Sequence, residues 1–294
     1  MSLSVSKTIT GVRGECSGRM SIGPARAPRR MMVKLVAALA IAGSIIATGA
    51  GCAAAADPEL QKVLAPTGKR RVGLYPGTPT SILPDATNPR GVGYDLGKEF
   101  ARRLGVAYEP VVFSKNAEVL EAVKTAHIDM VFTNASEKRA RDMDFGPRYL
   151  EIELGYIVPQ KSPVSTLADI DKPGVRLGVT KGSSSDGVRS RGLKSAEIVG
   201  AVKAGAAVDM IAAGQLDAFA TNKATLFEMQ QQLPGSSVPD EVWGVERHAI
   251  AIPKGRDQGR AFVEKFTNDA KSEGLIEAAV ARAGLRGAMA PASK

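Results

Sequence analysis

The sequence predicts an α/β fold with two lobes, each an open α/β sheet, and a cleft between the lobes. Short apolar runs of strand length alternate with amphipathic helical stretches, and this alternation occurs twice along the chain. The 294 residues are 44% hydrophobic, which is enough for one large or two medium cores. A further strand and two helices follow the second alternation, which indicates that the chain returns to its first lobe. We therefore expect lobe 1 to comprise residues 66–158 and 248–286, and lobe 2 to comprise residues 159–247.

Charge and aromatic content argue against a nucleic-acid partner. Aromatic residues make up 5% of the chain, too few for a base-stacking surface. The formal charge is +9, but seven basic residues and one acidic residue precede Cys52, so +6 of this charge belongs to the N-terminal segment. The remaining +3 is spread among interspersed charges of both signs, as on an ordinary solvated surface.

Residues 1–56 are expected to be a leader with a signal peptide. A basic start at 31–34 precedes an uncharged apolar run at 35–48, and small residues continue to Ala56. These are the three regions of a secretory signal. The apolar run is shorter than the ~20 residues that a membrane-spanning helix needs. Met31 and Met32 are alternative starts of translation.

Two cleavage sites remain open. Cleavage before Asp57 gives a soluble exported protein, whereas cleavage before Cys52 gives a lipoprotein anchored through that cysteine. Cys16 and Cys52 are the two cysteines of the chain, so the sequence beyond the leader offers no disulfide, thiol nucleophile or cysteine metal site. We expect a periplasmic or otherwise extracytoplasmic protein, soluble or lipid-anchored.

The first lobe begins with a strand and ends with one. Leu96, Phe100 and Leu104 form one helical stripe, and Gly105 is placed to end that helix. In chain order we expect strand 69–75, a helix from 93 to 104, strand 106–113, a helix opening at 114–116, the buried strand 128–132 and strand 150–158.

The second lobe repeats the alternation before the chain returns. A Gly/Ser loop at 180–186 feeds a helix, and the tail after Arg286 has no periodicity, so 287–294 is expected to be disordered. In chain order we expect a crossover at 159–163, a helical turn at 167–170, strand 175–179, apolar stretches at 198–199 and 208–213, strand 216–221, the returning strand 248–253 and helices 258–272 and 275–283.

The stretch from Ile128 to Tyr149 carries the strongest functional signal. Its buried strand ends in small polar residues and is followed by a charged segment that contains Arg139. In an open α/β sheet, ligands bind at the carboxyl ends of the strands. We therefore expect this strand to present hydroxyls, backbone amides and one guanidinium to a ligand.

Several motifs occur in an order that resembles a known family. The chain resembles the family 3 extracellular solute-binding proteins, the polar-amino-acid receptors of ABC importers, over about residues 69–286. This resemblance implies a type II periplasmic binding protein fold that traps its ligand by hinge closure. The motifs that carry it are Gly93–Leu96, Ile128–Val131, Ser136–Ala140, Asp144–Tyr149, Leu167–Ile170, Gly178–Ser183 and Gly214–Ala218.

The resemblance also implies a binding site. Ser136–Ala140 matches the family's Thr-x-x-Arg-Ala signature, whose arginine grips the ligand's α-carboxylate, so that role falls on Arg139. A guanidinium is a planar fork that matches a carboxylate, and lysine would replace it poorly. The backbone amides of Ser183 and Ser184 could hold the same carboxylate from the other lobe. The further expected ligand-binding residues are Thr133, Asn134, Ser136, Tyr75 and Asn222.

One departure bears on the ligand. In amino-acid receptors of this family an aspartate after the Leu-Asp-Ala strand holds the α-ammonium, and here that position carries Asn222. An amide accepts a hydrogen bond but supplies no countercharge for a desolvated ammonium. The ligand could therefore be a carboxylate without a neighbouring ammonium instead of an amino acid.

Enzymatic signals are few. We expect His127 to be a solvated turn residue and His248 a strand-edge residue, and no cluster of residues has nucleophile or metal-ligand spacing. We predict no catalytic residue, no metal and no cofactor, with a small-molecule ligand and an ABC permease as partners of a monomeric protein. The alternative is an enzyme on the same fold, as in the cyclohexadienyl dehydratase relatives that act on prephenate or arogenate, which would need a proton donor inside the cleft.

Overall fold

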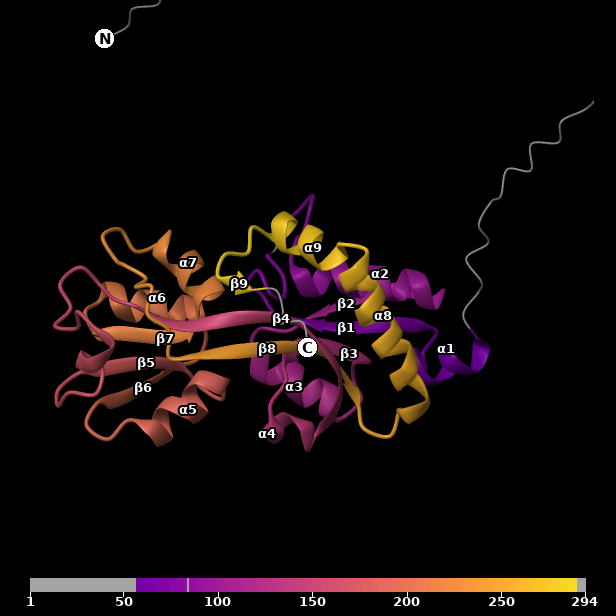
Figure 1. Cartoon of the computed structure of the whole chain (residues 1–294), viewed down its shortest axis with the longest axis horizontal. Helices are drawn as coiled ribbons and strands as arrows, with labels where there is room; N and C mark the ends of the chain where they lie inside the picture. Colours follow the sequence, from indigo (N-terminus) through magenta and orange to yellow (C-terminus); the bar gives the residue numbers. More distant parts are fainter. Residues whose placement is uncertain (1–56, 84, 290–294) are drawn as a thin grey trace, which may run out of the picture. The chain divides into compact units, whose positions relative to one another are not determined.

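One mixed sheet runs through the part of the chain that the computed structural model describes, residues 57–83 and 85–289 (Figure 1). Its strands follow the order β2-β1-β3-β8-β4-β7-β5-β6, with β9 paired to β4. The predicted leader, both of its cleavage sites and residues 290–294 lie outside the described residues. The strands are β1 (Lys69–Leu74), β2 (Ala107–Val112), β3 (Met130–Asn134), β4 (Met143–Ile157), β5 (Arg176–Thr180), β6 (Glu197–Ala201), β7 (Ala218–Asn222), β8 (Gly244–Pro253) and β9 (Ala288–Met289).

Parallel strands form both ends of the sheet. At one end β1 pairs with β2 and β3, and at the other β5 pairs with β6 and β7. Their carboxyl ends are therefore the places where an α/β sheet offers ligand sites. The predicted α/β class with two strand–helix alternations is confirmed.

Two long antiparallel strands connect these parallel ends. β8 pairs with β3 through Val131–Asn134, and β4 pairs with β8 over most of its length before it pairs with β7 through Leu154–Ile157. β4 begins seven residues before its predicted start and β8 begins four residues before its own. The C-terminal part of β4 therefore already pairs with β7, a strand of the other end of the sheet. This pairing comes before the predicted crossover at 159–163. The lobe boundaries themselves stay predictions.

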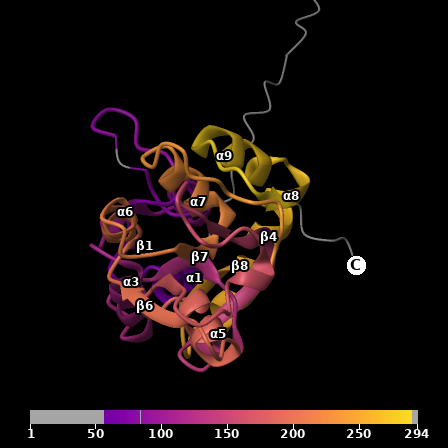
Figure 2. The same cartoon turned by 90° about the vertical axis from the view of Figure 1, so that its left-hand side faces the viewer.

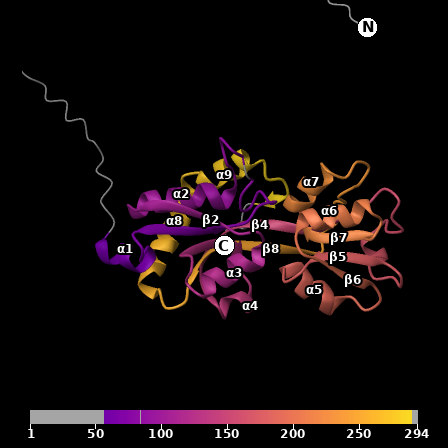
Figure 3. The same ribbon diagram turned by 180° about the vertical axis from the view of Figure 1, so that it is seen from behind.

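The helices gather around the two ends of the sheet. α5, α6 and α7 surround β5, β6 and β7 (Figures 2 and 3). The helices are α1 (Pro58–Leu64), α2 (Val92–Leu104), α3 (Asn116–Lys124), α4 (Glu137–Ala140), α5 (Ser184–Gly192), α6 (Ala204–Ala212), α7 (Lys223–Gln230), α8 (Arg260–Ser272) and α9 (Leu275–Ala283), with 3₁₀ turns η1 (Leu167–Asp169) and η2 (Asp257–Gly259).

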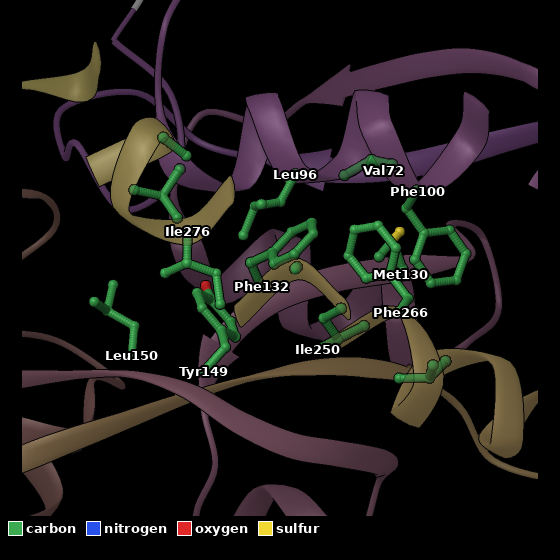
Figure 4. Packing of buried hydrophobic residues seen from close by; sticks show 14 of the residues in the cluster. Val72, Leu96, Phe100, Met130, Phe132, Tyr149, Leu150, Ile250, Phe266 and Ile276 are labelled. Atoms are coloured by element: carbon green, nitrogen blue, oxygen red, sulfur yellow. The ribbon is translucent and has the colours of Figure 1, made fainter. Parts of the chain in front are cut away.

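Each end of the sheet has its own apolar core. In the first, Phe100 of α2 packs edge-on against Phe266 of α8, and Phe132 of β3 packs edge-on against Tyr149 of β4 (Figure 4). The second end buries Phe219, Leu177 and further aliphatic residues between its strands and helices. The helical stripe predicted for α2 is buried, and Gly105 ends this helix with a φ of +71°.

Two segments near the ends of the described chain differ from the expectation. The stretch after Asp57, for which no element was predicted, forms α1, which begins with Asp57 accepting a hydrogen bond from the Glu59 amide. Within the tail predicted to be disordered, Ala288–Met289 instead form β9, which pairs with β4. Backbone pairing requires no side-chain periodicity, so no local pattern in the sequence indicates this strand.

Candidate functional site

A cavity of about 90 Å³ lies where the two parallel ends of the sheet face each other. One water molecule needs about 10–15 Å³, so this space suits a small organic molecule. The loop after β1, the ends of β3 and β7, and the residues at the N-terminal ends of α3, α5, α6 and α7 contribute to the wall. The lining residues are Tyr75, Pro76, Gly77, Thr78, Ser114, Lys115, Asn116, Thr133, Asn134, Arg139, Thr180, Ser183, Ser184, Val202, Lys203, Ala204, Thr221, Asn222, Thr225, Glu246 and His248.

Arg139 places a guanidinium in this wall. It sits on the single turn α4, whose N-cap is Ser136, and its Nη1 donates to Thr133 Oγ1 (2.7 Å) and to the Asn134 carbonyl (3.1 Å). Burial lowers the pKa of Arg139, while Glu246 and Tyr75 act in the opposite direction. Among the described residues its side chain is hydrogen-bonded to these two groups and to no carboxylate. The guanidinium stays charged and retains free donors for an anion.

Both polar atoms of the Asn222 side chain are hydrogen-bonded to neighbouring protein groups. As the N-cap of α7, its Oδ1 accepts from the Thr225 amide (3.0 Å), and its Nδ2 donates to Glu246 Oε2 (3.0 Å). The side chain lies at the cavity wall, and its carbonyl and amide ends both have protein partners. It therefore orients Glu246 and begins α7.

Glu246 and His248 are cavity residues that sequence reasoning missed. They lie two apart on β8 and so share one face, where Glu246 is 8% and His248 4% exposed. His248 Nε2 lies 3.3 Å from Glu246 Oε2. The prediction that His248 is a strand-edge residue is wrong, because β8 lies between β3 and β4. The available signal was the run of three polar residues, Glu246 to His248, just before the apolar residues of this strand.

The environment keeps Glu246 ionised. Burial by itself would raise the pKa of this carboxyl group. The hydrogen bond and charge of His248, the charge of Arg139 and the Asn222 amide together outweigh burial, so the pKa lies below its ordinary value. A carboxylate thus lies in the same cavity wall as the Arg139 cation.

Asn134 connects the two sides of the cavity. Its Oδ1 accepts from the Arg247 amide of β8 (2.8 Å), and its Nδ2 donates to Ser184 Oγ at the start of α5 (2.9 Å). Ser183 caps α5 by accepting from the Asp186 amide, and its own amide donates to the Thr180 carbonyl (3.1 Å). The Ser183 amide, expected to hold a ligand carboxylate, is therefore already engaged in a turn.

Tyr75 brings a neutral phenol to the wall. Burial is the main cause that raises its pKa to about 12, with a further contribution from the charge of Glu246. Seven of the eight predicted ligand-binding residues line the cavity, namely Tyr75, Thr133, Asn134, Arg139, Ser183, Ser184 and Asn222. Their contact with a ligand stays a prediction.

Ser136 is the predicted residue that does not line this cavity. It lies in a neighbouring groove of about 750 Å³, and its hydroxyl caps α4 by accepting from the Arg139 amide (3.4 Å). Groove and cavity share Asn134, Arg139, Ser183 and Ser184 as a common wall. Ser136 therefore positions the turn that carries Arg139.

The described residues contain neither a candidate metal cluster nor a candidate membrane-spanning helix. Across 57–83 and 85–289 no group of three or more His, Cys, Asp or Glu side chains could hold a metal ion. In this part of the chain no helix has both the length and the apolar character to cross a bilayer. His127 is exposed in a turn before β3, as expected.

Curated relatives match the chain at low identity. The membrane-bound lytic murein transglycosylase F of Idiomarina loihiensis is 26% identical over 255 residues, 83% of this chain and 54% of the relative. The same-named protein of Vibrio cholerae is 32% identical over 103 residues, 34% of this chain and 19% of the relative. The chain thus spans from a fifth to about half the length of these relatives. The ABC transporter glutamine-binding protein GlnH of Bacillus subtilis is 22% identical over 66% of this chain and 72% of its own length.

Solved structures match the fold more completely. The solute receptor for L-cysteine of Neisseria gonorrhoeae superposes with a TM-score of 0.67 at 22% identity, over 74% of this chain and 90% of that one. An ancestral amino acid-binding protein, described as a precursor of cyclohexadienyl dehydratase, gives a TM-score of 0.66 at 22% identity, over 76% and 98%. The expected type II periplasmic binding protein fold is confirmed by these matches.

A family model covers most of the folded chain. The model described as bacterial extracellular solute-binding proteins, family 3, matches residues 71–283. This span includes every strand that contributes to the cavity, and it agrees with the family that the ordered motifs resemble. The chain belongs to the bacterial extracellular solute-binding proteins, family 3.

Proposed function

We propose that the protein is the substrate-binding component of an ABC importer and captures a small amino acid or related carboxylate by hinge closure. The observation that carries this proposal is the Arg139 guanidinium, which lies in the cavity wall and, among the described residues, is hydrogen-bonded to Thr133 and Asn134 and to no carboxylate. Arg139 is partly buried, and removing a cation from water without an ion-pair partner is costly, so a bound anion would relieve that cost. Thr133 and Asn134 hold the fork in place for it.

Contacts across the cavity support capture by closure. Asn134 of β3 donates to Ser184 of α5, and Thr225 of α7 donates to Thr78 in the loop after β1 (3.2 Å). β4 and β8 are the strands that join the two ends of the sheet, which suits them to the role of a hinge. Closing on these contacts would sequester the ligand from water.

The family and the cavity size support a small ligand and an extracytoplasmic role. Proteins of this family bind solutes outside the cytoplasm, and GlnH of Bacillus subtilis is named as an ABC transporter component. A cavity of about 90 Å³ suits a small organic ligand. The permease partner, the monomeric state and anchoring through Cys52 belong to this proposal.

The function is tested by identifying and measuring the ligand. Mass spectrometry of small molecules that co-purify with the protein comes first, followed by calorimetry with the twenty amino acids and with small organic carboxylates. We expect binding of at least one small carboxylate-bearing compound. Failure of all of them to bind would overturn the proposal.

Arg139→Met tests directly whether Arg139 binds the carboxylate of the ligand. Losing hydrogen bonds to a charged group should weaken ligand binding by about 1.5–3 kcal/mol, or roughly 10–150-fold in Kd. Arg139→Lys should recover only part of this loss, since an ammonium lacks the planar fork. Arg260→Met, which removes an exposed arginine from α8, is the matched control. Full-strength binding by Arg139→Met would remove Arg139 from the site.

The enzymatic alternative has one observation in its favour. A dehydratase needs a proton donor in the cleft, and Glu246 is a carboxyl group in the cavity wall. Its lowered pKa keeps it ionised at neutral pH, however, so it accepts protons rather than donating them. We expect no turnover of prephenate by the purified protein, and measured turnover would favour the enzyme.

A further inference from the structure

We infer that residues 285–289 form a C-terminal strap that ties α7 to β4 and restrains the motion of the two ends of the sheet against each other. The strap follows α9 and ends in β9, which lies between α7 and α9 (Figure 1). A strap has this effect only where the two ends of the sheet move, so the inference rests on the proposed hinge closure.

One side of the strap is anchored in the first core and on β4. Leu285 is buried in that core, and Ala288 packs against it. β9 pairs with β4 just before Leu154, where β4 begins to pair with β7, and the Glu153 amide donates to the Gly287 carbonyl (3.4 Å). The strap is therefore attached where β4 passes from one end of the sheet to the other.

The other side of the strap holds α7. Arg286 Nη2 donates to the Phe227 carbonyl (3.0 Å), and its guanidinium lies over the Phe227 ring, 4.3 Å from the ring centroid. α7 itself packs through Leu226 and Met229 into a core cluster of the second end. Arg286 therefore connects a segment anchored in the first core with a helix anchored in the second.

Gly287 brings the strap into close contact with the first turn of α7. Its φ is +73°, a conformation that favours glycine, and a Cβ at this position would lie 2.8 Å from Lys223 Cβ and 3.7 Å from the Ala224 nitrogen. Lys223 is 5% exposed, and its Nζ forms an ion pair with Glu153 of β4 (2.8 Å). Strap, helix and strand therefore contact one another around Lys223.

The turn that the strap holds carries part of the cavity wall. Asn222, the N-cap of α7, donates to Glu246, and Thr225 donates to Thr78 in the loop after β1. An opening motion that separates α7 from this loop would also pull α7 away from the strap. Breaking one ordinary hydrogen bond changes an equilibrium about 2–10-fold, so the strap should favour the closed arrangement by a factor of this size.

Distances between two spin labels test this effect in the protein without a ligand. Glu121→Cys on α3 and Arg191→Cys on α5 place the labels at exposed positions that line the groove of about 750 Å³. Cys16→Ser and Cys52→Ser keep the label off the two natural cysteines of the full chain. Pulsed electron paramagnetic resonance then measures how the population divides between short and long distances.

Two variants loosen the strap. Arg286→Met removes the hydrogen bond and the ring contact, and Gly287→Ala forces the strap away from Lys223. Each should lower the ratio of short to long distances about 2–10-fold. The matched controls should leave the ratio unchanged: Arg260→Met removes an exposed arginine of α8, and Gly274→Ala alters a glycine with a φ of +72° and no neighbour within 4 Å of an added Cβ.

Distances that are the same in the wild type and in both strap variants would overturn the inference, and so would an equal shift in the controls. Arg286 is exposed, so Arg286→Met decides the question even if Gly287→Ala fails to fold. The result is separate from the test of the proposed function. Absence of binding by the twenty amino acids and the small carboxylates would reject capture of such a ligand, whereas the label distances are measured without any of them.

Discussion

At the scale of the residue, Asp129 shows how one buried carboxylate can organise the start of a strand. It is 0% exposed just before β3 and forms ion pairs with Arg71 of β1 and Arg256 after β8, each at 2.9 Å. The Arg71 amide also donates to its Oδ2 (3.0 Å). These contacts fix β1, β3 and the end of β8 relative to each other, and thus the strand that leads to Arg139.

Asp129→Asn should lower the free energy of unfolding by about 3–5 kcal/mol, because it leaves buried cations without their partner. Burial would raise the pKa of Asp129, but its bonds to Arg71 and Arg256 outweigh burial and lower it. A carboxyl group with a lowered pKa stabilises the fold above its unfolded-state pKa and loses that effect as the pH falls. Urea unfolding over an acidic pH series should therefore show a steeper loss for the wild type than for Asp129→Asn. The exposed Asp257→Asn is the control, and equal pH slopes would contradict the assignment.

At the scale of the element, α1 packs against the first core although no helix was predicted there. Leu64 is 0% exposed, and the guanidinium of Arg70 donates to its carbonyl. Arg70 is itself buried over the ring of Phe100, 4.6 Å from the ring centroid. The helix thus adds one large apolar side chain and one backbone acceptor to the core. It is too short for its sequence pattern to predict this burial.

Leu64→Ala should cost about 2–5 kcal/mol of unfolding free energy, as for other fully buried leucines. Chemical denaturation monitored by circular dichroism measures the change. Val112→Ala removes a valine that is 55% exposed on β2 and should stay within about 0.5 kcal/mol of the wild type. A Leu64→Ala effect as small as that control would show that α1 contributes little to the core.

At the scale of the whole described fold, the cavity depends on contacts between opposite ends of one sheet. The Asn134–Ser184 hydrogen bond joins β3 to the start of α5, residues fifty positions apart in the chain. In the proposed hinge closure, a bond of this kind would favour the closed arrangement, so it should slow release of a bound ligand more than it speeds capture.

Ser184→Ala should therefore weaken ligand binding by about 0.5–1.5 kcal/mol, roughly 2–10-fold, with most of the change in the dissociation rate. Stopped-flow displacement of the ligand identified by calorimetry measures that rate. Ser195→Ala removes an exposed hydroxyl beyond α5 and should change neither rate. A Ser184→Ala effect confined to the association rate would argue against its role in closure.

The sequence by itself determined the fold class, the main strands and helices, and most of one wall of the cavity. Period-2 and period-3.6 patterns report which faces are buried, and the polar residues that end a buried strand report where a ligand site begins. The sequence alone could predict Thr133, Asn134 and Arg139 as site residues, since they lie close together along a single stretch.

Only the tertiary structure decided which other groups meet them. Glu246 and His248 come from a strand more than one hundred residues further along, and their burial depends on β8 lying between β3 and β4. The same holds for β9, whose partner β4 is distant in sequence. Local patterns record the period of an element, whereas the carboxylate that joins Arg139 in the cavity wall is set by strand order, which no local pattern contains.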